Sequence, residues 1–390
     1  MAAPSPLHRH QSSLERIINF PPHARLPEAQ RIRAQTVFYS IIDHFNLSDD
    51  ESCSKYKRPL LVRYTYEYSR SDTSRDTFLR AFTESMELDI TDEALDINWD
   101  DKGIEDKLRS KLMEFSDFLL DNFFLPLKAS SKRTPQPSPA HLSAVQRALG
   151  GAQDYTGTPE RISTLHTLCL IRDRHRCVVS RKFNVKEAAE RLSQDMNAQD
   201  EEGNPLREQA FDVLEAAHIL PHALMQVDKD LKLDKSKNAA LSILDMFDVG
   251  VTRLIEGAEI DRPFNAISLT PLLRTCLGNF DIFFEPVPDH PPHTYRIDTF
   301  LPAVVLRDLP VTRTLFTTSD RTIDPPSPRL LAIHSAIAHI LHLSAAGEYI
   351  NKILSDMEKI ATQEDGSTEL GRLVGLGLGG WFDGSIDAFA

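Results

Sequence analysis

The stretch LEAAHILPHAL, residues 214–224, and the stretch RPFNAISLTPLLRTCLGNFDIFFEP, residues 262–286, decide the expected fold of this chain. The first predicts a strand that ends at His218 and stops before Pro221, because proline has no N–H to donate to a sheet. The second predicts a strand that Asn265 opens, followed by a short helix that begins near Pro271. We therefore expect a histidine at the end of one strand, an asparagine on its partner strand, and a helix packed beneath them.

This expected layout fits the hydrolysis of phosphodiester bonds. Such hydrolysis requires a base that activates water, a group that orients the base, and positive charge near the phosphate in the transition state. His218 is the candidate base and Asn265 the candidate orienting residue. A buried histidine and a turn asparagine are the plainer interpretations of the same two residues, since asparagine often caps local backbone groups.

Three segments carry a resemblance to a known family: RCVVS (176–180), EAAHILP (215–221) and NAISLT (265–270). They resemble the C-V-V/I-T-G, E-A-A-H-I-x-P and N-A-x-x-L-T pattern of fungal HNH-domain proteins, a branch of the HNH endonucleases, over roughly residues 159 to 357. The resemblance implies a ββα fold of the metal-dependent type, with His218 as general base and Asn265 holding the loop that orients it. It also implies a metal-binding histidine on the helix, but Arg274 occupies that position. Ala217 stands before the base, where many HNH enzymes have a metal ligand.

Arg274 changes the metal chemistry that the family pattern implies, because a guanidinium has no acceptor for a cation. If a divalent ion such as Mg²⁺, Mn²⁺ or Zn²⁺ binds, we expect His222 or Glu215 among its ligands, with Asp281 as another carboxylate. Alternatively, Arg274 itself contacts the scissile phosphate through its planar fork, which makes it a third candidate catalytic residue. A further alternative is a catalytically degenerate HNH fold that binds nucleic acid or a protein partner.

Residues 171–186, IRDRHRCVVSRKFNVK, contain six Lys and Arg residues and one Asp, although the whole chain has a formal charge of -13. Phosphate neutralisation needs such a local cluster, whereas the alternative is a solvated face balanced by nearby acidic residues. The candidate nucleic-acid contacts are Arg172, Arg174, Arg176, Arg181 and Lys182. Nucleic acid is thus the expected partner, through a patch rather than a basic surface.

Composition limits the class of protein. The 390 residues are 41% hydrophobic and 26% charged, which indicates a globular chain with a sizeable core. The four cysteines form no CxxC pair, so we expect neither a disulfide framework nor a zinc ribbon. No secretory signal and no apolar run long enough for a membrane span is recognised. An intracellular location follows as an expectation, without distinguishing nucleus from cytoplasm.

The chain as a whole predicts an α+β protein: an HNH-like ββα core with helical insertions, a mainly helical N-terminal region and a long C-terminal helix. Besides the ββα strands, we expect RCVVS to form a strand and FDIFFEPV with TYRIDTF to form a hairpin. A helical interaction protein with an HNH-like scaffold is the remaining alternative. The expected parts are a helical region (1–127), a Pro/Ser-rich linker (128–143), the nuclease domain (144–320), a helical extension (321–360) and a Gly-rich tail (361–390).

Overall fold

The structure is a computed structural model that describes residues 25–48, 55–93, 95–131, 158–226, 233–318, 322–358 and the single residues 372, 376 and 381. The chain forms two compact units. The first draws on the residues up to Ala129, on Gln226–Leu254 and on the residues from His339 onward. The second comprises Ser130–Met225 and Ile255–Ala338. Each unit is described by itself below.

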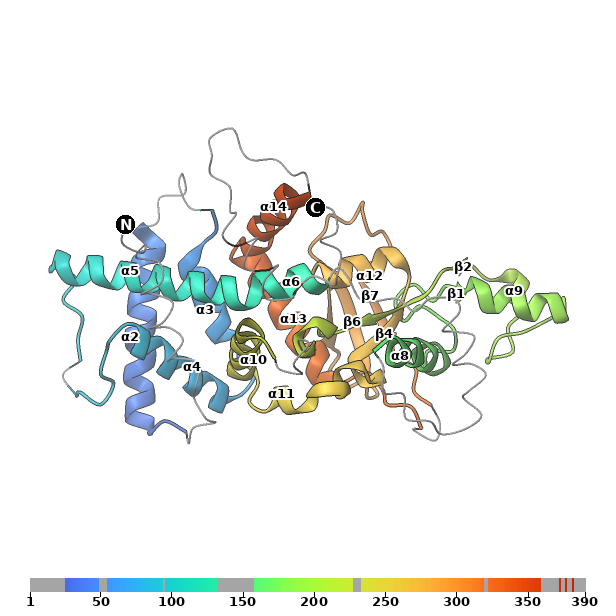
Figure 1. The fold of residues 1–390 in the computed structure, drawn as a ribbon, viewed down its shortest axis with the longest axis horizontal. Coiled ribbons are helices and arrows are strands. Elements are labelled where there is room, and N and C mark those ends of the chain that lie inside the picture. The colour runs from blue at the N-terminus through green and yellow to red at the C-terminus, as the bar shows by residue number, and fades with distance from the viewer. Residues whose placement is uncertain are drawn as a thin grey trace, which may run out of the picture. The chain divides into compact units, whose positions relative to one another are not determined.

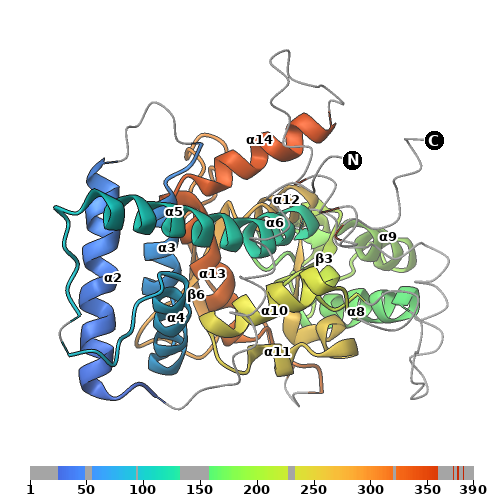
Figure 2. The same cartoon turned by 60° about the vertical axis from the view of Figure 1, so that its left-hand side comes forward.

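The first unit is helical, and Figure 2 shows α2, α3 and α4 side by side. Its core is aromatic, because Phe38, Phe78, Phe82 and Phe115 contact one another edge to face with ring centres 4.9–6.1 Å apart. Its helices are α2 (Glu28–Ser48), α3 (Arg58–Glu67), α4 (Asp72–Ser85), α5 (Lys102–Leu119), α6 (Leu125–Ser131), α10 (Lys235–Phe247), α11 (Val251–Leu254) and α14 (Ala346–Glu358), with a π-helical turn at Leu120–Phe124 between α5 and α6.

The second unit mixes helices with three small sheets, which confirms the predicted α+β class. β1 and β2 pair in parallel, β3 and β4 pair antiparallel, and β5, β6 and β7 form an antiparallel sheet in that order. The strands are β1 (Phe183–Asn184), β2 (Phe211–Asp212), β3 (Glu215–His218), β4 (Ala266–Leu269), β5 (Ile282–Pro286), β6 (Thr294–Thr299) and β7 (Val311–Thr314). The helices are α8 (Thr158–Arg172), α9 (Val185–Gln194), α12 (Pro271–Gly278) and α13 (Pro328–Leu343), the last of which ends in the other unit, with short 3₁₀ turns at Leu206–Glu208, His222–Met225, Gly257–Asp261 and Pro263–Asn265.

The predicted ββα arrangement is present. β4 lies between α8 and α12 (Figure 1), and β3 contacts the same two helices. Pro271 stands in the first turn of α12, where its missing N–H leaves no hydrogen bond unmade. In the β3–β4 pair His218 faces Ala266, so Asn265 lies directly beyond the end of the ladder. The hairpin predicted after this core is β5–β6, and β7 adds an edge strand that was not predicted.

One predicted strand is wrong. Residues 178–180, the VVS of RCVVS, form a turn whose two valines and Cys177 are buried. The turn closes because Ser180 N–H donates to the Cys177 sulfur at 3.4 Å, and Val178 N–H bonds to the Ser268 carbonyl on β4 at 3.0 Å. The apolar, β-branched composition therefore reflects burial against β4, not extension. The following Arg181 has a φ of 63°, which an extended strand does not allow.

Several expectations concern residues that are not described. Residues 132–143 of the predicted linker lie outside the described part, and Lys128–Ser131 belong to the end of α6. The Gly-rich tail lies outside it except for three residues. Gln226–Leu254, which we expected within the nuclease domain, groups with the helical unit. Among the described residues no single helix has the length and composition of a membrane span, although the bent pair α13 and α14 meets that test jointly.

Candidate active site and metal centre

Asn265 fastens the loop that follows His218. Its side chain is fully buried, and its Oδ1 accepts a hydrogen bond from Leu220 N–H at 2.9 Å. Its Nδ2 donates to the carbonyls of Leu220 at 3.0 Å and Ile260 at 2.9 Å. Its backbone carbonyl accepts from Ile219 N–H at 2.8 Å. Asn265 thus joins the end of β3 to the 3₁₀ turn Gly257–Asp261, and it contacts the backbone around His218 but makes no hydrogen bond to the imidazole.

Asp261 at the end of that turn contacts two histidines. Its Oδ1 lies 3.1 Å from His218 Nε2 and 2.6 Å from His222 Nδ1. The side chains of Asp261 and His218 are each 1% exposed, and that of His222 is 7% exposed. Asp261 Oδ2 accepts from Arg161 Nε on α8 at 3.2 Å. Both carboxylate oxygens are therefore engaged, one by imidazoles and the other by a guanidinium.

These contacts shift the proton affinities of the site. Burial raises the pKa of Asp261, but the hydrogen bonds and charges of His218 and His222 outweigh burial and hold it well below its ordinary value. Burial lowers the pKa of His218, against the opposing effect of Asp261. At neutral pH the site therefore contains an ionised carboxylate beside a His218 that is neutral.

The three side chains fit a metal ion in donor chemistry. One ligand atom from each of His218, His222 and Asp261 lies within 4.8 Å of the others. Two imidazoles and a carboxylate suit Zn²⁺ or another transition metal better than Mg²⁺, which prefers oxygen ligands. His222 is thus where a ligand was expected, and Asp261 is a carboxylate that the sequence analysis did not identify.

His218 keeps one ring nitrogen free of hydrogen bonds. Its Nδ1 is buried and has no hydrogen-bond partner among the described residues. A buried nitrogen of this kind costs free energy unless a water, proton acceptor or ligand reaches it. This is the atom of His218 through which general-base chemistry could proceed while Asp261 holds Nε2.

Arg274 and Glu215 lie on the other face of β3. Successive strand residues point to opposite faces, so Glu215 and Ala217 share the face toward α12 and His218 points the other way. Accordingly, Arg274 on α12 forms an ion pair with Glu215. The structure does not bring Arg274 or Glu215 to the His218 cluster. The α12 side of β3 therefore carries a guanidinium paired with a carboxylate.

Arg172 is a correction to the predicted nucleic-acid contacts. Its side chain is fully buried and forms a two-bond ion pair with Asp173, at 2.8 and 2.9 Å. It also donates to the backbone carbonyls of Pro263 at 2.6 Å and Ala266 at 2.9 Å. Asp173 in turn accepts from Ser268 N–H at 2.9 Å. This pair fixes β4 to α8, so Arg172 has no surface to offer a phosphate.

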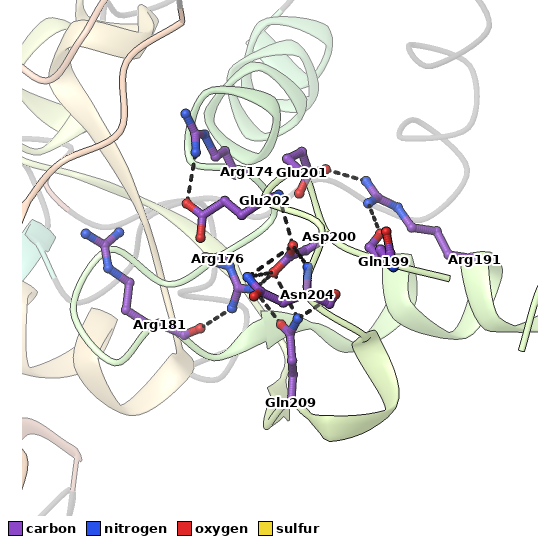
Figure 3. A network of polar contacts seen from close by, with 10 residues as sticks. All are labelled: Arg174, Arg176, Arg181, Arg191, Gln199, Asp200, Glu201, Glu202, Asn204 and Gln209. Carbon is purple, nitrogen blue, oxygen red and sulfur yellow. Dashed lines mark hydrogen bonds and ion pairs between the residues drawn. The ribbon is translucent and has the colours of Figure 1, made fainter. Parts of the chain in front are cut away.

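Arg176 belongs to a second polar network, drawn in Figure 3. Its guanidinium contacts the carboxylate of Asp200 and the amide of Gln209 and donates to the Arg181 carbonyl at 2.8 Å. Asp200 also accepts from the backbone N–H groups of Glu202 at 2.9 Å and Asn204 at 2.8 Å. This network folds the 199–209 loop, which identifies the acidic residues near the basic segment as internal partners.

The other basic candidates are nearer the surface. Arg174 pairs with Glu202 at 2.9 Å, and Lys182 pairs with Asp212 at 2.9 Å. Arg181 extends away from the Asp200 network (Figure 3) and donates to the Thr314 carbonyl at 2.6 Å. These three remain candidates for contact with a ligand.

Comparison with known proteins agrees with this geometry. Residues 177–285 match a family model described as HNH endonuclease. The match includes β3, β4 and α12, and with them His218, His222, Asp261 and Asn265. Over these residues the chain is therefore similar to HNH endonucleases. Searches of curated proteins and of solved structures found no match.

Proposed function

We propose that this protein is an HNH-type endonuclease that hydrolyses phosphodiester bonds in nucleic acid, with His218 as the general base. The observation that carries the proposal is His218 at the end of β3, held by a carboxylate within the segment that matches HNH endonucleases. A histidine base needs one ring nitrogen oriented by a partner and the other available to water. Asp261 supplies that partner, and Nδ1 is the available nitrogen.

The residues around His218 would divide the work as follows. Asp261 holds the imidazole in one tautomer and stabilises the imidazolium that forms when Nδ1 takes a proton from water. Asn265 keeps the loop after β3 in place through its contacts with Leu220. Because the His218 side chain is 1% exposed, this role requires the residues that bury it to move when substrate binds.

A divalent ion fits beside the base. If His218 acts as base, His222 and Asp261 are the residues left to hold an ion. Such an ion would supply positive charge to the phosphate in the transition state. Since Arg161 occupies the second oxygen of Asp261, that carboxylate would bind through Oδ1 alone.

The test is a cleavage assay with purified protein, plasmid DNA and RNA, and added Mg²⁺, Mn²⁺ or Zn²⁺. We expect nicking of the plasmid or degradation of the RNA, and its loss in His218→Ala. His290→Ala removes an exposed histidine and serves as the matched control. Metal content measured on both variants separates a base from a ligand, since loss of a base leaves the bound metal in place. No turnover with any of the metals contradicts the proposed activity.

A second function, a degenerate HNH fold that binds nucleic acid or a protein partner, is favoured by one observation. The Arg274–Glu215 ion pair occupies the face of β3 on which the family pattern expects the metal. Arg274→His distinguishes the alternatives. A metal-dependent cleavage that appears only in the variant indicates a decayed enzyme, whereas loss of a native activity indicates that Arg274 takes part in it.

A further inference from the structure

Two segments far apart in the sequence meet around Phe316, which follows β7. The guanidinium carbons of Arg181 and Arg174 lie 4.2 and 4.8 Å from the centre of the Phe316 ring. Arg313 on β7 donates to the Val179 carbonyl at 2.9 Å, and Arg181 donates to the Thr314 carbonyl at 2.6 Å. We call Arg174, Arg181, Arg313 and Phe316 the arginine cluster. All four are half-buried, so each has part of its surface in solvent.

The positive charge of this cluster is incompletely balanced. Within the described part of the chain, neither Arg181 nor Arg313 forms an ion pair with a carboxylate, and their hydrogen bonds go to backbone carbonyls. Arg174 pairs with Glu202, but these side chains are 40% and 45% exposed. An exposed pair of this kind stabilises little and can exchange its carboxylate for another anion.

Arg181 also has an unused hydrogen-bond donor, which an anion could accept from. Its Nη1 is buried and makes no hydrogen bond among the described residues. Burial, and next the nearby charge of Arg313, lower the pKa of Arg181 to about 10. Two guanidiniums held close together, one with an unused buried donor, carry a cost that a bound anion offsets.

The backbone holds this arrangement at unfavourable angles. Arg181 has a φ of 63°, and Arg174 and His175 have φ values of 53° and 54°. Residues other than glycine adopt this left-handed region rarely, and such strain gathers at sites where side-chain placement matters. Two of the three arginines of the cluster, Arg174 and Arg181, thus have a strained backbone conformation themselves.

We propose that Arg181, which packs on Phe316, and Arg313 bind two neighbouring backbone phosphates of a nucleic acid. Guanidiniums match phosphate oxygens in geometry, and phosphates receive most protein hydrogen bonds in such complexes. This proposal rests on the proposed function and narrows it, since it assigns substrate binding to Arg181 and Arg313 and excludes Arg172. Phe316 and Arg313 lie outside the basic segment and outside the matched residues 177–285.

The test is fluorescence anisotropy with a labelled DNA duplex and a labelled RNA hairpin, in EDTA so that binding is separated from cleavage. For Arg181→Gln/Arg313→Gln we expect a rise in Kd of about tenfold or more, and a slope of log K against log salt shallower by about 1.8. Arg181→Lys/Arg313→Lys keeps both charges, so its salt slope should stay near that of the wild type. Arg207→Gln is the control, because Arg207 is 62% exposed and paired only with Glu208 among the described residues.

The outcomes separate this proposal from the proposed function. If the double glutamine variant binds both probes with the wild-type Kd and slope while the wild type cleaves, only the phosphate site is refuted. If the wild type neither binds nor cleaves, the nuclease proposal fails and the phosphate site with it. Loss of binding in the double variant, with Arg207→Gln unchanged, supports the site whether or not cleavage occurs. Should the double variant melt below the assay temperature, Arg313→Gln alone replaces it, with an expected slope change of about 0.9.

Discussion

Replacing Asp261 by asparagine tests the centre of the site, because the substitution removes the negative charge and keeps the side chain nearly the same size. The carboxylate accepts three contacts, from His218 at 3.1 Å, His222 at 2.6 Å and Arg161 at 3.2 Å. Hydrogen bonds to a charged group contribute about 1.5–3 kcal/mol each, but neighbouring bonds do not add, and loss of the charge also removes its cost of burial. We therefore expect Asp261→Asn to lower the free energy of unfolding by about 3–5 kcal/mol.

The assay must report on the second unit. Both tryptophans, Trp99 and Trp381, belong to the first unit, so tryptophan fluorescence reports on the wrong part of the chain. Thermal unfolding followed by circular dichroism should show a Tm lower by roughly 6–20 °C for a unit of this size. Hydrogen exchange measured by mass spectrometry should accelerate in the peptide 214–225, since Ile219 and Leu220 N–H are bonded to Asn265 beside the Asp261 turn.

Glu259→Gln is the matched control for Asp261→Asn. Glu259 lies two residues away, and its ion pair with Arg262 is about half exposed, so its loss should cost less than about 1 kcal/mol. A Tm of Asp261→Asn within about 2 °C of the wild type, together with unchanged exchange in 214–225, refutes the reasoning. It would mean that Asp261 is not the anchor of His218 and His222.

Three more variants test buried contacts of the same unit. Arg172→Met removes the buried pair with Asp173 and should cost about 3–5 kcal/mol. Arg174→Met removes only a solvent-accessible pair with Glu202 and should leave the thermal transition almost unchanged. Asn265→Ala leaves backbone groups of the loop unpaired, so we expect a loss of about 2–4 kcal/mol and faster hydrogen exchange in 214–225. Burial lowers the pKa of His334 to about 4, so the unfolded chain binds more protons than the folded one between about pH 6.5 and 4. The free energy of unfolding should therefore decrease as the pH is lowered from about 6.5 to 4, by up to about 3 kcal/mol. In urea titrations His334→Phe should make this pH dependence weaker.

Local sequence patterns predicted the core of the second unit well. Pro221 marked the end of the segment that contains β3, and Pro271 marked the boundary between β4 and α12. Proline ends a strand and favours the first turn of a helix whatever the rest of the fold is. The same reasoning found the β5–β6 hairpin around its Pro-rich turn. These features depend on neighbours in sequence, which a single sequence displays.

Features that depend on distant partners were missed. Asp261 stands in EIDRPFN with no local sign of a site, and its importance comes from His218, 43 residues earlier in the chain. Arg172 counted as a surface charge because its partners, the carbonyls of Pro263 and Ala266, lie more than 90 residues away. Its adjacent partner Asp173 is the one signal in the sequence that pointed to an internal ion pair. Opposite charges side by side are common on surfaces too, so that signal does not distinguish the two cases.

The Arg274–Glu215 ion pair and the cluster of His218, His222 and Asp261 lie on opposite faces of β3. Glu215 and Ala217 lie on the face of β3 toward α12, where Arg274 forms an ion pair with Glu215. A guanidinium has no acceptor for a cation, so the Arg274–Glu215 pair makes that face a poor place for a metal ion. On the opposite face, toward which His218 points, Asp261 and His222 each offer an atom that can bind a metal ion. If an ion binds the second unit, the donor chemistry therefore favours the α8 side of β3, where His218, His222 and Asp261 lie.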